Sequence, residues 1–174
     1  ANKFMAAIPD DEAIVTNTKK AMLTLNSISQ VVNDRNKLFE KAGACNIKEY
    51  NQMYINRRLW FVDGHEYLPY IVVVINEFSD LIMTYGKEAE DLIVSLAKEA
   101  CTVGIHMVIT TRRPSKSVVT DAVKDSIPER IAFRMVLKSE SQIILGHPDA
   151  NRLAGRGDMF CIQNNELVRV QCAF

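Results

Sequence analysis

Residues 69–110 read PYIVVVINEFSDLIMTYGKEAEDLIVSLAKEACTVGIHMVIT. The run 70–75 is apolar and β-branched without polar alternation, which predicts a strand buried on both faces, as in a parallel sheet. Residues 87–102 predict a helix, because apolar residues recur along one stripe at Ala89, Leu92, Ile93, Leu96, Ala97 and Ala100. Residues 105–110 predict the next strand. A strand, a helix and a strand in this order imply a right-handed crossover and a parallel pair, so the expected fold class is α/β.

Two helices are expected before this stretch. Residues 17–42 have apolar residues at three- and four-residue spacing, with a cap at residue 16 or 17. A capping-box pattern at 46–49 opens a second helix over about 47–58.

These two helices precede the sheet in the sequence and form a helical preface, by which we mean residues 1–66. We expect Trp60 and Phe61 to pack this preface on the sheet. The predicted organisation is a single domain over 1–174, with a helical part over 1–66 and a sheet-containing part over 67–174.

Alternation and turn signals continue to the C-terminus, where we expect Met159, Phe160 and Cys161 to lie in the core. The predicted elements are a short helix over 118–124, a strand over 130–136, a helix opened by a capping box at Ser139 and Gln142, and two strands, 159–163 and 167–173, joined in a hairpin at Asn164-Asn165.

Composition excludes several classes of protein. The 174 residues are 48% hydrophobic and 24% charged, which is outside the range of a disordered tail, a collagen-like repeat or a disulfide-stapled miniprotein. Lys plus Arg and Asp plus Glu are each 21, so the net charge of zero indicates no partner.

Cysteine spacing and hydropathy point to a soluble, cytoplasmic protein. The four cysteines form no CxxC pair, so we expect buried thiols in a reducing compartment and no zinc site. No apolar run reaches the roughly 20 residues of a membrane helix, and we expect no membrane contact by this chain.

Positive charge gathers in one region. Residues 111–138 contain seven Lys or Arg and three Asp or Glu, a local balance of +4. Such clustering favours phosphate backbones, although Arg112, Arg113 and Lys116 also fit an ordinary solvated loop. In a parallel sheet, chemistry lies beyond the carboxyl ends of the strands. This directs attention to Asn76, Glu77 and to residues 111–113 and 137–138.

Three segments resemble one family. The stretch from LPYIVVVINEFSD to GIHMVITTRRPS, together with PERIAFRM at 128–135 and GRGDM at 155–159, resembles the FtsK/SpoIIIE family of hexameric DNA translocases from about residue 14 to the C-terminus. The resemblance implies a partial RecA-like three-layer fold with a mostly parallel sheet. It also implies ATP and Mg²⁺ as cofactors, double-stranded DNA and a ring of six subunits as partners, and a role in chromosome segregation or cell division.

The resemblance assigns roles to individual positions. Glu77 matches the carboxylate that activates water, and Asn76 replaces the aspartate associated with magnesium, so Asn76 is a second-shell magnesium residue at best. Arg112 replaces a sensor glutamine. Cys101 and Gln142 stand where the family has arginine. Arg113 and Lys138 match basic residues that face the DNA channel in the family, and Lys116, on the same basic loop as Arg113, is also expected to contact DNA.

The phosphate loop of the family, GxxxxGK[ST], is absent from residues 1–174, because the only Gly-Lys pair, at 86–87, is followed by Glu88. Three hypotheses therefore stand: a portion of an ATP-driven translocase motor, a degenerate non-hydrolysing relative that binds DNA or other subunits, and an α/β domain that binds a protein. We expect negligible ATP turnover by this chain alone. From the residues alone, Glu77 is also compatible with a solvated helix cap.

Overall fold

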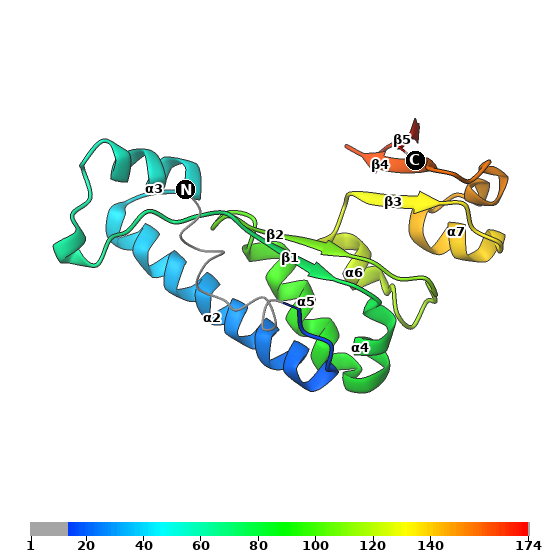
Figure 1. The fold of residues 1–174 in the computed structure, drawn as a ribbon, viewed down its shortest axis with the longest axis horizontal. Helices are drawn as coiled ribbons and strands as arrows, with labels where there is room; N and C mark the ends of the chain where they lie inside the picture. Colours follow the sequence, from blue (N-terminus) through cyan, green and yellow to red (C-terminus); the bar gives the residue numbers. More distant parts are fainter. Residues whose placement is uncertain (1–13, 174) are drawn as a thin grey trace. The chain divides into compact units, whose positions relative to one another are not determined.

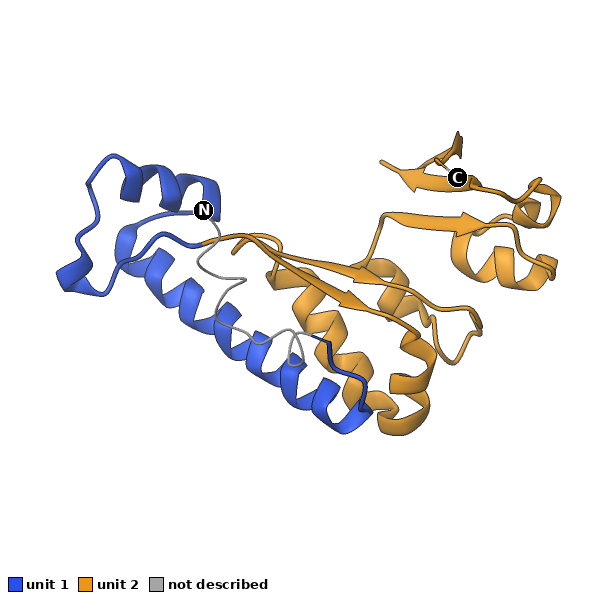
Figure 2. Ribbon diagram, viewed as in Figure 1, with its two compact units in different colours: residues 1–68 blue, residues 69–174 orange. Residues whose placement is uncertain are grey.

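The computed structural model describes residues 14–173. The chain divides into two compact units, residues 1–68 and 69–174 (Figure 2). The division falls at Pro69, where the apolar run begins. That the two units form one domain stays a prediction, and each unit is described by itself.

The first unit is helical. It contains α2 (Thr18–Ala42), α3 (Ile47–Ile55) and the 3-10 turn η1 (Phe61–Asp63) (Figure 1). The Asn17 side chain accepts a hydrogen bond from the Lys19 amide at 2.8 Å, and Gly43 ends α2 with a φ of 68°. Both ends of the predicted long helix are therefore confirmed within a residue.

A polar and aromatic cluster holds the first unit together. Tyr50 is fully buried, stacks on Phe39 with ring centroids 5.1 Å apart, and its hydroxyl lies 3.0 Å from Nδ1 of His65. The buried side chain of Asn51 donates to the Leu68 carbonyl at 2.7 Å and accepts from the Leu68 amide at 2.9 Å. This pairing satisfies both polar groups of an extended segment without a neighbouring strand.

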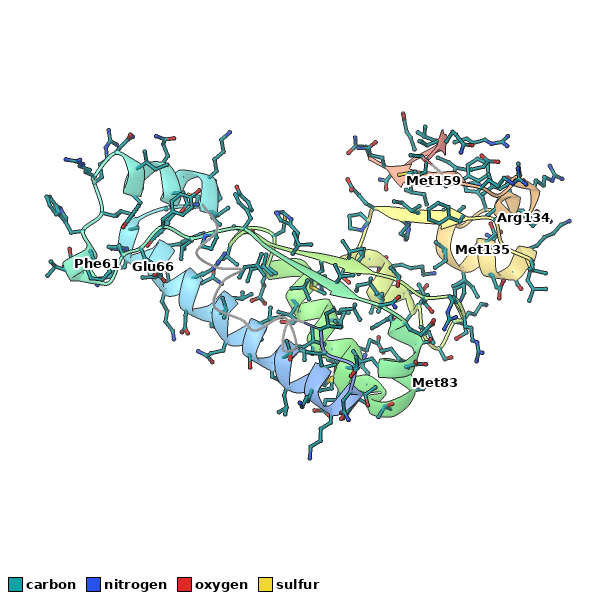
Figure 3. The ribbon with its side chains drawn as sticks, in the orientation of Figure 1. Phe61, Glu66, Met83, Arg134, Met135 and Met159 are labelled. Atoms are coloured by element: carbon teal, nitrogen blue, oxygen red, sulfur yellow. The ribbon has the colours of Figure 1, made fainter. Side chains whose placement is uncertain are left out.

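Trp60 and Phe61 are exposed at the end of the first unit, and their packing on the sheet stays a prediction. Their exposed fractions are 66% and 77%, and they line a shallow groove of about 540 Å³ with Tyr54, Ile55, Arg57, Leu59 and Tyr67. Helix α3 ends at Ile55, earlier than predicted, because Arg57 adopts a left-handed conformation with a φ of 56°. The following turn then carries Phe61 on its outside (Figure 3).

The second unit begins with the predicted parallel pair. Strands β1 (Ile71–Ile75) and β2 (Ile105–Ile109) pair in parallel, with Val73 opposite Met107. Between them lie α4 (Phe78–Tyr85) and α5 (Lys87–Glu99), separated at Gly86. The sequence analysis missed α4, whose apolar residues follow directly on the strand without a recognisable cap.

Burial of β1 differs from the prediction. Alternate residues are exposed, and Val72 and Val74 each expose 64% of their surface. Helix α5, which buries Ala89, Ile93 and Leu96, belongs to the crossover that covers one face of the pair (Figure 1). Among residues 69–173 of the second unit, we find no equivalent cover for the second face, so the prediction of burial on both faces is wrong within this unit.

The rest of the second unit is an antiparallel sheet with short helices. Strand β4 (Asp158–Gln163) pairs with β3 (Arg130–Phe133) on one side and β5 (Glu166–Gln171) on the other. The helical elements are α6 (Asp121–Ser126), α7 (Lys138–Leu145) and η2 (Asp149–Arg152). The α/β class and the C-terminal hairpin are confirmed, while among the described residues 14–173 parallel pairing is confined to β1 and β2.

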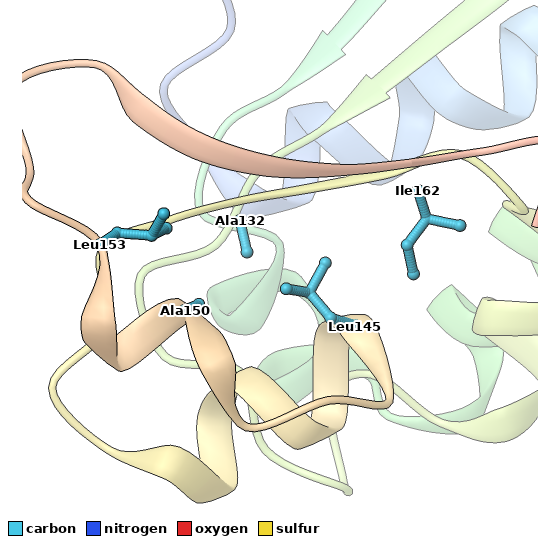
Figure 4. Packing of buried hydrophobic residues seen from close by; sticks show 5 residues of the cluster. All are labelled: Ala132, Leu145, Ala150, Leu153 and Ile162. Atoms are coloured by element: carbon cyan, nitrogen blue, oxygen red, sulfur yellow. The ribbon is translucent and has the colours of Figure 1, made fainter. Parts of the chain in front are cut away.

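This sheet has its own small core. The buried residues that form it are Ala132, Leu145, Ala150, Leu153 and Ile162 (Figure 4). Phe160 packs against the cluster and is half-buried, in agreement with its predicted place in the core. Ser141 is fully buried and links α7 to the backbone that follows it. Its hydroxyl donates to the His147 carbonyl at 2.5 Å and accepts from the Ala150 amide at 3.1 Å.

The predicted hairpin turn is confirmed, and one predicted helix cap is wrong. Asn164 and Asn165 both have positive φ, at 51° and 65°, as a two-residue hairpin turn requires. The turn at 155–157 has positive φ throughout. The capping box at Ser139 is wrong, because Leu137 caps α7 without a side-chain bond and Gln142 donates instead to the Gly146 carbonyl at the other end.

The expectation of buried thiols is also wrong. Cys161 is half-buried, and the exposed cysteines are Cys45, Cys101 and Cys172. In residues 14–173 we find no group of three or more His, Cys, Asp or Glu residues that could hold a metal ion. None of the helices in that range is both long and apolar enough to traverse a lipid bilayer.

Candidate functional site

The parallel pairing brings the predicted polar residues to one edge. Strands β1 and β2 run side by side and end together (Figure 1). The Thr110 amide donates to the Ile75 carbonyl at 2.9 Å, and the Phe78 amide donates to the Thr110 carbonyl at 2.8 Å. These backbone bonds fix the segment 76–77 against the segment 110–112, so the juxtaposition predicted from the α/β fold is observed.

Glu77 occupies a strained position at this edge. Its φ of 58° and ψ of 60° place a non-glycine residue in the left-handed region, at the junction of β1 and α4. Its carboxylate makes no capping bond to the helix backbone. Oε1 instead accepts from the Ser79 hydroxyl at 2.7 Å and from the Thr111 hydroxyl at 3.3 Å. The helix-cap alternative therefore does not describe the carboxylate.

Arg112 is the main partner of Glu77. Its Nε donates to Oε2 at 2.6 Å and its backbone amide donates to Oε1 at 3.2 Å. The Arg112 side chain is 89% exposed, whereas that of Glu77 is 16% exposed. The arginine thus covers the carboxylate from the solvent side.

The pair has a clear electrostatic consequence. The hydrogen bond from the Arg112 side chain, followed by those from Ser79 and the Arg112 amide, lowers the pKa of Glu77 to about 2. The same pairing raises the pKa of Arg112. A carboxylate with so low a pKa and with both oxygens engaged is a weak base toward water.

Asn76 is engaged as well. Its Oδ1 accepts from the Thr110 hydroxyl at 2.8 Å. The edge therefore offers Mg²⁺ one neutral amide oxygen and one carboxylate that is already paired, and residues 1–174 contain no GxxxxGK[ST] loop to hold phosphates. The residues present do not fit a complete magnesium–nucleotide site.

The basic residues predicted to face DNA divide into two groups. Arg113 and Lys116 are exposed on the loop that follows β2, and the Arg113 amide donates to the Thr111 hydroxyl at 3.2 Å. Lys138 opens α7. Throughout residues 14–173, we find no hydrogen bond or ion pair joining Lys138 to this loop, so the loop and Lys138 are not brought together by direct contact.

The two other replacement positions lie apart from this edge. The Cys101 sulfur is 3.8 Å from Nδ1 of His106, which stacks on Tyr70 and is exposed. Gln142 lines a hollow of about 410 Å³ together with residues that include Asp121, Lys124, Asp125 and Arg130.

Two hydroxyl residues of this edge, Ser79 and Thr110, were not predicted from the sequence, whereas Thr111 belongs to the predicted segment 111–113. Ser79, Thr110 and Thr111 donate to the Asn76 and Glu77 side chains. Their signal in the sequence is position alone, because each lies within two residues of Glu77 or of the end of β2.

Residues 3–116 match the model of the FtsK/SpoIIIE family. This chain belongs to that family. The FtsK/SpoIIIE chain is 40% identical over 164 residues to DNA translocase FtsK of Staphylococcus epidermidis (strain ATCC 35984) and 39% identical over 163 residues to DNA translocase FtsK of Oceanobacillus iheyensis. These alignments cover 92% of this chain but only 20% and 21% of the relatives, so the chain spans about a fifth of their length.

Solved structures agree with the family assignment. The pCW3 conjugation coupling protein TcpA, in a monomer form with ATPγS, matches with a TM-score of 0.79 and 25% identity over 91% of this chain and 45% of that chain. The cytoplasmic domain of the type VII secretion ATPase EccC from Thermomonospora curvata matches with a TM-score of 0.73 and 19% identity, over 92% of this chain and 19% of that chain. The fold of this FtsK/SpoIIIE chain is that of RecA-like ATPase motors.

Proposed function

We propose that this chain is a portion of an ATP-driven double-stranded DNA translocase motor, acting as a ring of six subunits on the cytoplasmic side in chromosome segregation or cell division. The observation that carries the proposal is the edge at which Glu77 is bonded to the loop that carries Arg112, Arg113 and Lys116. One edge thereby connects the carboxylate at the family's water-activating position with a basic surface. Relatives named DNA translocase FtsK, about 40% identical, support the DNA-directed role.

In this proposal ATP and Mg²⁺ are held only in part by this chain. Residues 1–174 lack the GxxxxGK[ST] loop, whose backbone amides and lysine bind the phosphates of a nucleotide. In this proposal, residues other than 1–174 bind the phosphates. Asn76, Glu77 and Arg112 would then line the nucleotide side of the edge, with Glu77 facing the water. No step of hydrolysis is assigned to the chain alone.

The proposed DNA contact is electrostatic. Arg113 and Lys116 are exposed on a loop within the region 111–138, whose local charge is +4. Each lysine or arginine that neutralises a phosphate makes the slope of log K against log salt more negative by roughly 0.9. Lys138 is assigned to the same DNA surface by its family position.

A specific observation favours a second candidate, a non-hydrolysing module that binds DNA or neighbouring subunits. The Arg112 guanidinium occupies the Glu77 carboxylate, and Asn76 supplies an amide where the family has an acid. These two features reduce both basicity and magnesium affinity at the position where hydrolysis requires them.

DNA binding is tested by fluorescence anisotropy of this chain with a labelled 30-base-pair duplex at several salt concentrations. We expect Arg113→Gln and Lys116→Gln each to weaken binding several-fold and to reduce the salt slope by about 1. Lys98→Gln, in the last turn of α5, is the charge-matched control and should change neither. Equal effects of all three variants would contradict the assignment of the loop.

Turnover separates the two candidates. A chain extended upstream to include a phosphate loop is assayed for duplex-stimulated ATP hydrolysis with Mg²⁺. The translocase proposal expects hydrolysis that Glu77→Gln abolishes. The second candidate expects none until the family residues are restored in the double variant Asn76→Asp, Arg112→Gln.

A further inference from the structure

The Arg112 side chain has hydrogen-bond donors left over after its bond to Glu77. Its Nε bonds to Glu77, while 89% of its side chain is open to solvent on the loop that also carries Arg113 and Lys116. Within residues 14–173, we find no hydrogen bond donated by either Nη atom of Arg112. An arginine fork with one donor on a carboxylate and the others free has the geometry to meet a phosphate as well.

We propose that Arg112 is a shared counter-ion, for which the Glu77 carboxylate and a DNA phosphate compete, so that DNA on the loop releases Glu77. This inference rests on the proposed DNA contact by the loop and adds a coupling between that contact and the strand-end carboxylate.

The charges of the pair indicate that Glu77 and a DNA phosphate compete for Arg112, rather than both binding it at full strength. While Glu77 holds Arg112, the pair carries no net charge, so the guanidinium attracts phosphate less than an unpaired arginine would. The arginine of the pair is 89% exposed, and water and salt weaken the attraction between exposed charges. A phosphate, which can accept two guanidinium donors at once, is therefore able to displace the carboxylate.

Release of Glu77 would also loosen the start of the loop. The same carboxylate accepts from the Arg112 amide and the Thr111 hydroxyl, and that hydroxyl accepts from the Arg113 amide. Because coupling between two sites is reciprocal, any change that weakens the hold of Glu77 on Arg112 must tighten DNA binding.

The test is a double-variant cycle in the anisotropy assay. Glu77→Gln keeps an oxygen that can accept from Ser79 and from the Arg112 amide, but removes the charge. We expect it to tighten duplex binding roughly 5- to 10-fold at 0.1 M salt and to steepen the salt slope by about 1, because one more cation becomes available to phosphate. In the Arg112→Gln background the same substitution should change binding less than 2-fold.

Asp80→Asn is the matched control. Asp80 is exposed in the first turn of α4 and acts on Arg112 only through space, without a hydrogen bond to it. Its removal should tighten binding less than 2-fold. A gain for Asp80→Asn equal to that for Glu77→Gln, or a gain for Glu77→Gln that persists in Arg112→Gln, would overturn the proposal.

A spectroscopic measurement reports on the pair without relying on affinity. The Nε–H resonance of Arg112, assigned by its loss in Arg112→Gln, should move on DNA addition toward its position in Glu77→Gln. A resonance that stays in place while DNA binds would show that phosphate does not displace the carboxylate. If the unmodified chain fails to bind duplex in a salt-dependent manner, the proposed DNA contact itself is wrong, which distinguishes that failure from a failure of the coupling.

Discussion

Gly157 is a position where replacing glycine with alanine should disturb the neighbouring backbone directly. Its φ is 85°, and a Cβ atom there would lie 2.7 Å from the Cys172 carbonyl oxygen and 3.0 Å from Nε2 of Gln171. The backbone oxygen cannot move freely, because the Cys172 amide is bonded to the Gly157 carbonyl at 2.8 Å. Gly157→Ala therefore adds strain and forces the end of β5 away from the turn.

The magnitude is the sum of two terms. A left-handed conformation costs an alanine about 1–2 kcal/mol relative to glycine. Displacing the Cys172 segment weakens one backbone hydrogen bond, which contributes about 1 kcal/mol. We expect the free energy of unfolding of Gly157→Ala to fall by about 2–3 kcal/mol.

Gly155→Ala is the matched control. Its φ of 83° is nearly the same, but the nearest atom to an added Cβ, on the flexible Arg134 side chain, is 3.7 Å away. Only the conformational cost applies, so the fall should be about 1–2 kcal/mol. Urea unfolding followed by far-ultraviolet circular dichroism compares the two variants. Equal losses of stability would refute the argument that close approach, rather than φ, makes Gly157 necessary.

Three further outcomes can be checked by denaturation. Ser141→Ala should lower the free energy of unfolding by about 1–3 kcal/mol in urea, because the buried Ala150 amide and His147 carbonyl lose their shared partner; wild-type stability would contradict that role. Asn51→Leu should destabilise the first unit by about 2–4 kcal/mol, since both polar groups of Leu68 lose their bonds; fluorescence of Trp60, the only tryptophan, follows that unit. The Arg169 side chain, bonded to Asp158 at 2.9 and 2.7 Å, and then the Ala154 amide lower the Asp158 pKa from 3.8 to about 2. Because the folded pKa lies below the ordinary value, the stability from this ion pair is present above about pH 4 and is lost as the pH falls toward 2; Asp158→Asn should flatten that part of the pH profile, and an unchanged profile would count against the pair.

The elements that could be predicted from the sequence are those with local signals. The long helix α2 has its cap at Asn17 and its stop at Gly43, and the hairpin has Asn164-Asn165, all within a few residues of the backbone that they shape. The β-branched run and the helix stripe likewise encoded the strand–helix–strand order, and hence the parallel edge at which Glu77 and the loop after β2 meet.

Which side chains form hydrogen bonds with residues far away in the sequence could be seen only in the tertiary structure. Glu77 and Arg112 are 35 positions apart, and each fits an ordinary solvated side chain until parallel pairing brings their segments within 2.6 Å. Exposure was decided in the same way: Val72 and Val74 carry a buried-strand signal, yet burial depends on what packs over them and not on their own residue type. Local propensity acts over one turn of helix or one hairpin, whereas ion pairing and burial depend on the three-dimensional positions of distant segments.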